Sequence, residues 1–291
     1  MQRFKCRPGL RFRAAVAAAL ACAVMAADVP APAEESVDDL VRARLVAEQP
    51  GLKPGATAWL AVALTMKPGW HTYWRNAGDA GMPTQVDWTL PAGYTAGALQ
   101  WPMPAIFLQG IATSYGYHGE VALLAPLRVP ADAQPGQEVA IAAHVQWLAC
   151  AKICVPGEAR VSITLPVAAA PGAADATTAT LFRTARAALP HDGTTRTAAA
   201  VSEASIALDV PPAALMGIAE PTVAFLPLDD ALIDHGSPQR LAGAGGHPVL
   251  TLTRGPRLGR LDPEIAGLLV VEDKATHSRQ GFMLTAQVAG Q

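Results

Sequence analysis

The chain has 291 residues, enough for two domains, and 51% of them are hydrophobic, which indicates packed cores rather than disorder. It carries 22 basic and 24 acidic residues, a balance that argues against nucleic acid or an anionic membrane surface as partner. Beyond Val24, no apolar run approaches the roughly 20 residues that a bilayer-spanning helix needs. We therefore expect a soluble mature protein.

Residues 1–26 are predicted to be a secretory signal peptide. An apolar stretch at 14–24 is followed by small residues and preceded by five basic ones: Arg3, Lys5, Arg7, Arg11 and Arg13. Cleavage close to Ala27 would remove Cys6 and Cys22 and leave 17 basic against 24 acidic residues, a net charge near −7. As an alternative, residues 19–22 faintly resemble a lipoprotein cleavage site, which would leave a lipid anchor on Cys22.

Residues 27–166 are predicted to be an antiparallel β-sandwich. Short apolar or alternating runs end at turn residues, and no helical period lies between them. The runs are 59–66, 85–90, 121–129, 139–149 and 159–165. Since the last two flank Cys150 and Cys154, the cysteines are expected at the tip of a β-hairpin.

The rest of the chain is predicted to be a linker with a short helix, at 167–190, and a second, smaller β domain, at 191–291. Ala, Pro, Gly and Thr dominate the start of the linker, and the helix is placed at 180–189 before Pro190. The strands expected in the second domain are 205–210, 222–228, 249–253, 267–272 and 282–288. This domain has no cysteine and no cluster of His, Asp and Glu that suggests catalysis.

Cys150 and Cys154 are three residues apart, a spacing that lets them bond to each other. In an exported protein such a pair is normally a disulfide. Closing a loop of about five residues stabilises a fold by only about 2 kcal/mol, so a structural staple would do better between distant strands. Lys152, between the cysteines, would help to stabilise a thiolate. The spacing alone leaves both a structural and an exchanging disulfide open.

Metal binding is the other chemistry that the sequence raises. His71, among aromatic residues, is more typical of a packed side chain than of a metal ligand, because metal sites need three or four converging ligands. Soft ligands for Cu(I) exist in principle: His71, His118, Met66, Met82, Met103 and the two thiolates. They form no Met-x-x-Met or His-x-His cluster, and Asp79 between glycines is typical of a loop. We expect no metal and no organic cofactor.

Several segments resemble the N-terminal periplasmic region of the DsbD and ScsB family of transmembrane disulfide reductases. They are Pro68–Thr84 (PGWHTYWRNAGDAGMPT), Trp101–Pro104 (WPMP), Ser114–Glu120 (SYGYHGE) and Trp147–Pro156 (WLACAKICVP). The Gly-Trp-His-Thr-Tyr-Trp and Trp-Leu-x-Cys patterns are specific, whereas the match over the second domain is loose.

The resemblance implies an immunoglobulin-like first domain in the periplasm, with Cys150 and Cys154 as the catalytic pair of a thiol:disulfide oxidoreductase. It implies a cap loop over the pair and residues that support it: Tyr115, Gly116, Tyr117 and His118 in the loop, and Trp147, Lys152 and Pro156 as support. The implied partners are periplasmic thioredoxin-like oxidoreductases and a membrane-embedded reductase, expected on a separate polypeptide because the family's membrane and thioredoxin-like domains do not follow.

The family serves cytochrome c biogenesis or copper tolerance, and the three-residue spacing is closer to its ScsB-like branch. The resemblance also mildly favours Cys154 as the sulfur that faces the partner. The alternative function is a non-catalytic copper-handling or assembly module in which the disulfide is only structural.

Overall fold

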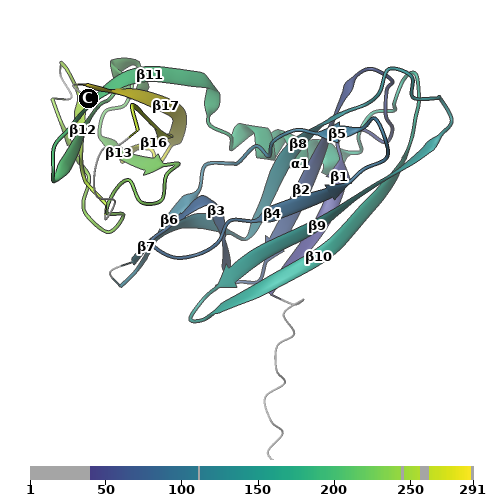
Figure 1. Cartoon of the computed structure of the whole chain (residues 1–291), viewed down its shortest axis with the longest axis horizontal. Coiled ribbons are helices and arrows are strands. Elements are labelled where there is room, and N and C mark those ends of the chain that lie inside the picture. The colour runs from purple at the N-terminus through teal and green to yellow at the C-terminus, as the bar shows by residue number, and fades with distance from the viewer. Residues whose placement is uncertain (1–39, 111, 244–245, 256–261, 290–291) are drawn as a thin grey trace, which may run out of the picture. The chain divides into compact units, whose positions relative to one another are not determined.

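The computed structural model describes residues 40–289, apart from 111, 244–245 and 256–261. The predicted signal peptide, with Cys6 and Cys22, lies outside the described residues. Within them the chain is almost entirely β, with three sheets, one α-helix and one short 3-10 helix (Figure 1). The predicted all-β class is confirmed.

Two sheets of the first part of the chain form a sandwich. One sheet has the order β1 (Val41–Ala47), β2 (Thr57–Met66), β8 (Glu120–Arg128) and β5 (Thr95–Ala96). The other has the order β10 (Cys154–Pro166), β9 (Glu138–Cys150), β3 (His71–Gly78), β7 (Ala112–His118) and β6 (Ala105–Gln109), and β4 (Gln85–Thr89) also pairs with β9. All their strand pairs are antiparallel, and residues of both sheets share one buried core.

Strand β2 is buried on both faces, and its side chains alternate between two layers. One set points into the sandwich core: Leu60, Val62 and Leu64. The other set, Ala61 and Ala63, packs with Phe182 and Ala185 of helix α1 (Ala176–Ala187). The small alanines let the helix approach the sheet closely, so α1 forms an outer layer on the sandwich.

Helix α1 begins at Ala176, four residues before the start predicted from the sequence. The cause is Asp175, whose carboxylate accepts a hydrogen bond from the Thr178 N–H at 2.9 Å and caps the helix. At the other end, Arg186 forms an ion pair with Glu48 and lies over the Trp59 ring, 5.5 Å from its centroid. None of the helices in the described part of the chain is long and apolar enough to cross a membrane.

Strands β9 and β10 form a long hairpin (Figure 1), paired without a break from Glu138–Pro166 at one end to Cys150–Cys154 at the other. On β9, alternate side chains are buried in the core, as one covered face requires. The predicted placement of both cysteines at a hairpin tip is confirmed.

The second part of the chain forms a third, mixed sheet with its own core. Its order is β13 (Pro221–Pro227), β16 (Glu264–Asp273), β17 (Arg279–Ala289), β11 (His191–Val201), β12 (Ser205–Asp209), β15 (Val249–Thr253) and β14 (Arg240–Ala242). The 3-10 helix spans Pro212–Leu215, and the β11–β17 pair is parallel. A second, smaller β part is therefore present, and the domain boundaries given above stay a prediction.

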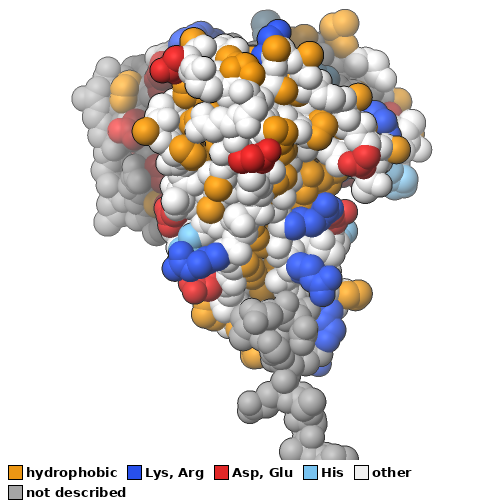
Figure 2. All heavy atoms as spheres, turned by 90° about the vertical axis from the view of Figure 1, so that its right-hand side faces the viewer, with side chains coloured by type: hydrophobic (Ala, Val, Ile, Leu, Met, Phe, Trp, Pro, Cys, Tyr) orange, Lys and Arg blue, Asp and Glu red, His pale blue; other side chains and the backbone are white. Residues whose placement is uncertain are grey.

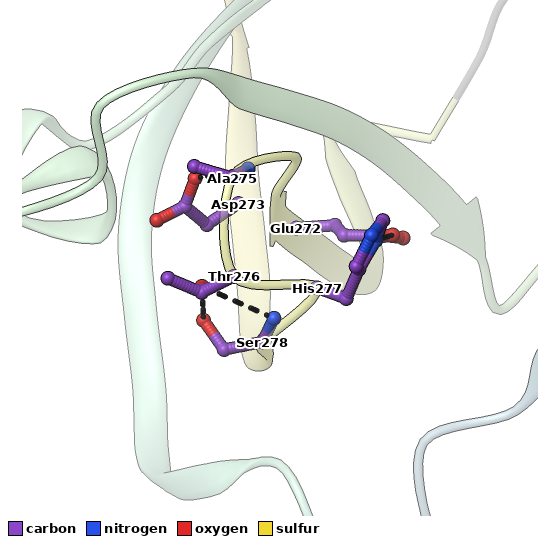
Figure 3. Close-up of polar contacts among 6 residues, drawn as sticks. All are labelled: Glu272, Asp273, Ala275, Thr276, His277 and Ser278. Carbon is purple, nitrogen blue, oxygen red and sulfur yellow. Dashed lines mark hydrogen bonds and ion pairs between the residues drawn. The ribbon is translucent and has the colours of Figure 1, made fainter.

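A group of polar contacts lies in the turn between β16 and β17 (Figure 3). The Asp273 carboxylate accepts a hydrogen bond from the Ala275 N–H at 3.0 Å, and Ser278 N–H donates to Thr276 Oγ1 at 3.3 Å. His277 has a positive φ of 57° and lies 3.9 Å from Glu272. These contacts build a tight turn.

On a different face, Figure 2 shows acidic and basic side chains interspersed with hydrophobic ones.

Candidate functional site

Cys150 and Cys154 form a disulfide that closes the three-residue turn at the hairpin tip. Their Cα atoms are 4.1 Å apart, and the Ala151 N–H donates to the Ile153 carbonyl oxygen at 3.0 Å inside the turn. The two cysteines differ in exposure, because Cys150 is 1% exposed while Cys154 is an exposed residue. A second protein can therefore reach Cys154 and not Cys150.

Tyr73 of β3 is the polar side chain in contact with the accessible sulfur. Its hydroxyl oxygen lies 3.8 Å from Cys154 Sγ. The ring is held against Gly81, where a Cβ atom would lie 2.3 Å from Tyr73 Cε1, so the loop after β3 leaves room only for glycine. Burial raises the pKa of Tyr73, which keeps the phenol protonated at neutral pH. A protonated phenol can donate a hydrogen bond to a thiolate at Cys154 and favour it.

His71, two residues earlier on β3, is paired directly with Cys150 across the sheet. It is 5% exposed and packs between two rings, at centroid distances of 5.2 Å from Tyr73 and 4.7 Å from Phe107. Among the described residues its Nε2 atom has no hydrogen-bond partner. Burial lowers the pKa of His71, so the imidazole is neutral at pH 7.

The four residues predicted to cap the pair belong to strand β7 or its end. The Tyr115 hydroxyl bonds to His235 Nδ1 at 2.9 Å, and the Tyr117 hydroxyl donates to the Pro102 carbonyl at 2.8 Å. Burial raises the pKa of both tyrosines, and their rings lie in the sandwich core. Gly116 lies opposite Tyr73, and exposed His118 lies opposite His71. The segment is thus a strand rather than a loop, and the contacts of its tyrosine hydroxyls are directed away from the cysteines.

Phe107 of β6 supplies an aromatic ring that packs on His71. Strand β6 pairs with β7, and the Phe107 ring lies 4.7 Å from the His71 ring and 6.2 Å from the His118 ring. The sequence did not single out Tyr73 and Phe107 as site residues, and it favoured a packed or hydrogen-bonded role for His71 over a metal ligand. The available signal was the His-Thr-Tyr spacing, which puts His71 and Tyr73 on one face of a strand.

The three predicted supporting residues surround the hairpin tip in different ways. Trp147 is 2% exposed, and its ring packs so closely on Gly157 that a Cβ atom there would lie 2.6 Å from the Trp147 Nε1 atom. Lys152 and Pro156 are exposed, and Ile153 beside Lys152 is 66% exposed. The surface around Cys154 thus presents one cation and one large apolar side chain.

The copper ligands considered above are distributed over several elements. Within the described residues, no group of three or more His, Cys, Asp and Glu side chains could hold a metal ion. Met66 is buried and accepts a hydrogen bond from the Thr72 hydroxyl, and the Met103 side chain lies against Gly281. Asp79 accepts from the Thr113 N–H at 2.7 Å and so fixes a loop.

Residues 42–166 match the family model of the thiol:disulfide interchange protein DsbD, N-terminal. The structure is similar to the N-terminal periplasmic domain of ScsB from Proteus mirabilis, with a TM-score of 0.60, 17% identity, and coverage of 85% of this chain and 92% of that one. No curated protein matches the chain.

Two further solved structures are much less similar. The major pilin subunit BcpA of Bacillus cereus, in its D312A form, aligns over 86% of this chain and 66% of its own with 9% identity and a TM-score of 0.28. A protein of unknown function from Porphyromonas gingivalis W83 aligns over 85% of this chain and 99% of its own with 12% identity and a TM-score of 0.23. The match to the family model and the ScsB fold confirm the resemblance read from the sequence: residues 42–166 are similar to the N-terminal region of DsbD and have an immunoglobulin-like fold.

Proposed function

We propose that the protein is a periplasmic thiol–disulfide exchange domain in which Cys150 and Cys154 cycle between a disulfide and a dithiol. The observation that carries the proposal is the unequal access of the two sulfurs at the hairpin tip, with Cys154 exposed and Cys150 buried. Exchange requires one sulfur that a partner can reach and a second that resolves the mixed disulfide. The family match supports this chemistry and a periplasmic location.

The exchange step divides the work between the two cysteines. In the dithiol form, the Cys154 thiolate attacks the disulfide of a partner, one partner sulfur leaves as a thiolate, and a mixed disulfide forms. Cys150 then loses its proton and attacks Cys154 Sγ, which expels the second partner sulfur. The pair ends as a disulfide and the partner as a dithiol, with two electrons transferred. Tyr73 stabilises the Cys154 thiolate in the first step through its hydroxyl.

The proposed partners are proteins whose own cysteines can approach an exposed hairpin tip. Periplasmic thioredoxin-like oxidoreductases exchange at Cys154, and a membrane-embedded reductase restores the dithiol. Ile153 offers these partners an apolar contact next to the reactive sulfur, since it is 66% exposed.

A redox titration of the purified protein tests the proposal against a structural disulfide. We expect the pair to have a reduction potential above about −300 mV, as exchanging disulfides do. Structural disulfides have reduction potentials below that value, so they stay oxidised. Mass spectrometry after alkylation gives the dithiol fraction in glutathione and dithiothreitol buffers. A pair still oxidised below that potential would identify the non-catalytic module instead.

Shielding of the pair gives a second expected result. Phe107→Ala should speed alkylation of reduced Cys150 severalfold, because it removes a ring that packs on His71, the residue opposite this buried cysteine. Tyr115→Ala should mainly lower the melting temperature, because that ring is 1% exposed and lies in the core. The cap role predicted for the tyrosines would instead require faster alkylation in the Tyr115→Ala, Tyr117→Ala double variant.

A further inference from the structure

His71 is a buried basic side chain that the exchange steps described so far do not use. It is 5% exposed, and its Nε2 atom has no hydrogen-bond partner among the described residues. Leaving a buried polar atom unpaired costs stability, so an unpaired ring nitrogen invites a functional explanation. The neighbours that the structure gives it are the rings of Tyr73 and Phe107 and, across the sheet, Cys150.

The sheet register places His71 and both cysteines on one face. His71 pairs with Cys150, and Cys150 pairs with Cys154, each in antiparallel strands. Directly opposite residues of such strands project to the same face, with Cβ atoms about 4.5–5.5 Å apart. Tyr73 lies two residues after His71 on the same face, and it contacts Cys154. His71 therefore lies opposite the buried cysteine on the shared face, while Tyr73 contacts the exposed cysteine through its hydroxyl and packs with the buried one.

The buried cysteine needs a proton acceptor. A thiol of ordinary pKa near 8.5 is only about 3% ionised at pH 7, and an apolar surrounding reduces that fraction further. We propose that His71 accepts the proton of the Cys150 thiol during resolution of the mixed disulfide, an inference that rests on the exchange function proposed above. The proton moves to the imidazole, the Cys150–Cys154 bond forms, and the bond from Cys154 to the partner breaks with release of the partner as a thiolate.

The state of His71 suits this role. Burial lowers its pKa, so the ring is neutral and able to accept a proton at pH 7. The other titratable groups that face it are Tyr73 on its own strand, Cys150 on β9 and His118 on β7. Tyr73 is protonated at this pH, because burial raises its pKa, and His118 is exposed to solvent. His71 is thus the buried base in this group.

The reaction of the reduced protein with 5,5′-dithiobis(2-nitrobenzoate) separates the two steps. Attack by Cys154 releases one thionitrobenzoate at a rate that depends on reagent concentration, and attack by Cys150 releases a second at a rate that does not. We compare wild type, His71→Gln and the control His144→Gln between pH 6 and 9. His144 lies on β9, the strand that carries Cys150, but its ring is paired with Glu158 at the surface.

We expect His71→Gln to slow the concentration-independent release about tenfold at pH 7, with the difference shrinking toward the thiol pKa. The concentration-dependent release should stay within about twofold, and His144→Gln should match wild type. Equal concentration-independent rates in wild type and His71→Gln would overturn the inference. A concentration-independent rate of wild type that rises tenfold per pH unit would also overturn the inference, and this measurement needs no variant.

Failure of the proposed function gives a different result. If wild type releases no second thionitrobenzoate, the cysteines do not exchange, and both the function and the role of His71 are excluded. A merely structural role of His71 would lower the melting temperature of His71→Gln and leave the pH profile of the second release unchanged. Melting temperatures are therefore measured on the same samples.

Discussion

Cys150→Ser is expected to trap a covalent complex with a thioredoxin-like partner, whereas Cys154→Ser forms none. In the first variant the exposed Cys154 still attacks the partner's disulfide, but the buried sulfur that would resolve the complex is absent. In the second variant the remaining sulfur is 1% exposed and cannot meet a partner. Turnover should fall at least about a hundredfold in both variants, because exchange needs two sulfurs.

The trapping experiment uses a thioredoxin-like protein whose resolving cysteine is replaced and whose remaining cysteine carries a thionitrobenzoate disulfide, so that attack by Cys154 releases thionitrobenzoate and the complex cannot reverse. Non-reducing electrophoresis and mass spectrometry identify the adduct and the cysteine that carries it. Both variants should stay folded, because the small disulfide loop contributes only about 2 kcal/mol. Equal trapping by the two variants would contradict the assigned roles, and unfolding of both at ordinary temperature would show that the bond is structural.

The sequence predicts the strands that have a clean pattern and misses those that do not. Val249–Thr253 matches its predicted run, and β9 extends the run predicted at 139–149 by one residue at each end, because both strands alternate between a buried and an open face. Strand β3 was missed because seven of its eight residues are buried or half-buried on both faces while its sequence, HTYWRNAG, is largely polar and aromatic. No period-2 hydrophobic signal can arise from such a strand.

The candidate site shows the same division between local and non-local information. The cysteine pair and its hairpin are local features, so spacing and flanking strands were enough to predict them. The contacts of Cys154 with Tyr73 and of His71 with Phe107 join residues 81 and 36 positions apart. They depend on the order β9–β3–β7–β6, in which β9 pairs with β3 and β3 with β7, strands that are not consecutive in the chain. A single sequence gives no direct measure of that order.

Gly116→Ala is expected to be among the most damaging single substitutions in the sandwich. Gly116 lies opposite Tyr73 where β7 pairs with β3, and a Cβ atom there would be 2.0 Å from the Thr72 carbonyl oxygen. This neighbour is backbone, so it cannot rotate away, and the strands must separate beside the site. We expect a loss of about 3 kcal/mol in unfolding free energy, at the upper end of ordinary overpacking.

Gly119→Ala is the matched control for this prediction, because it adds the same methyl group three residues later. Gly119 has a φ of 71° with no atom within 4 Å of its added Cβ, so the cost is only the left-handed backbone, about 1 kcal/mol. Thermal unfolding measures both variants, and the alkylation rate of reduced Cys154 reports on Tyr73, which a displaced β7 would disturb. Equal melting temperatures would contradict the close β3–β7 contact, whereas a larger drop with altered alkylation in Gly116→Ala alone would tie that contact to the cysteine pair.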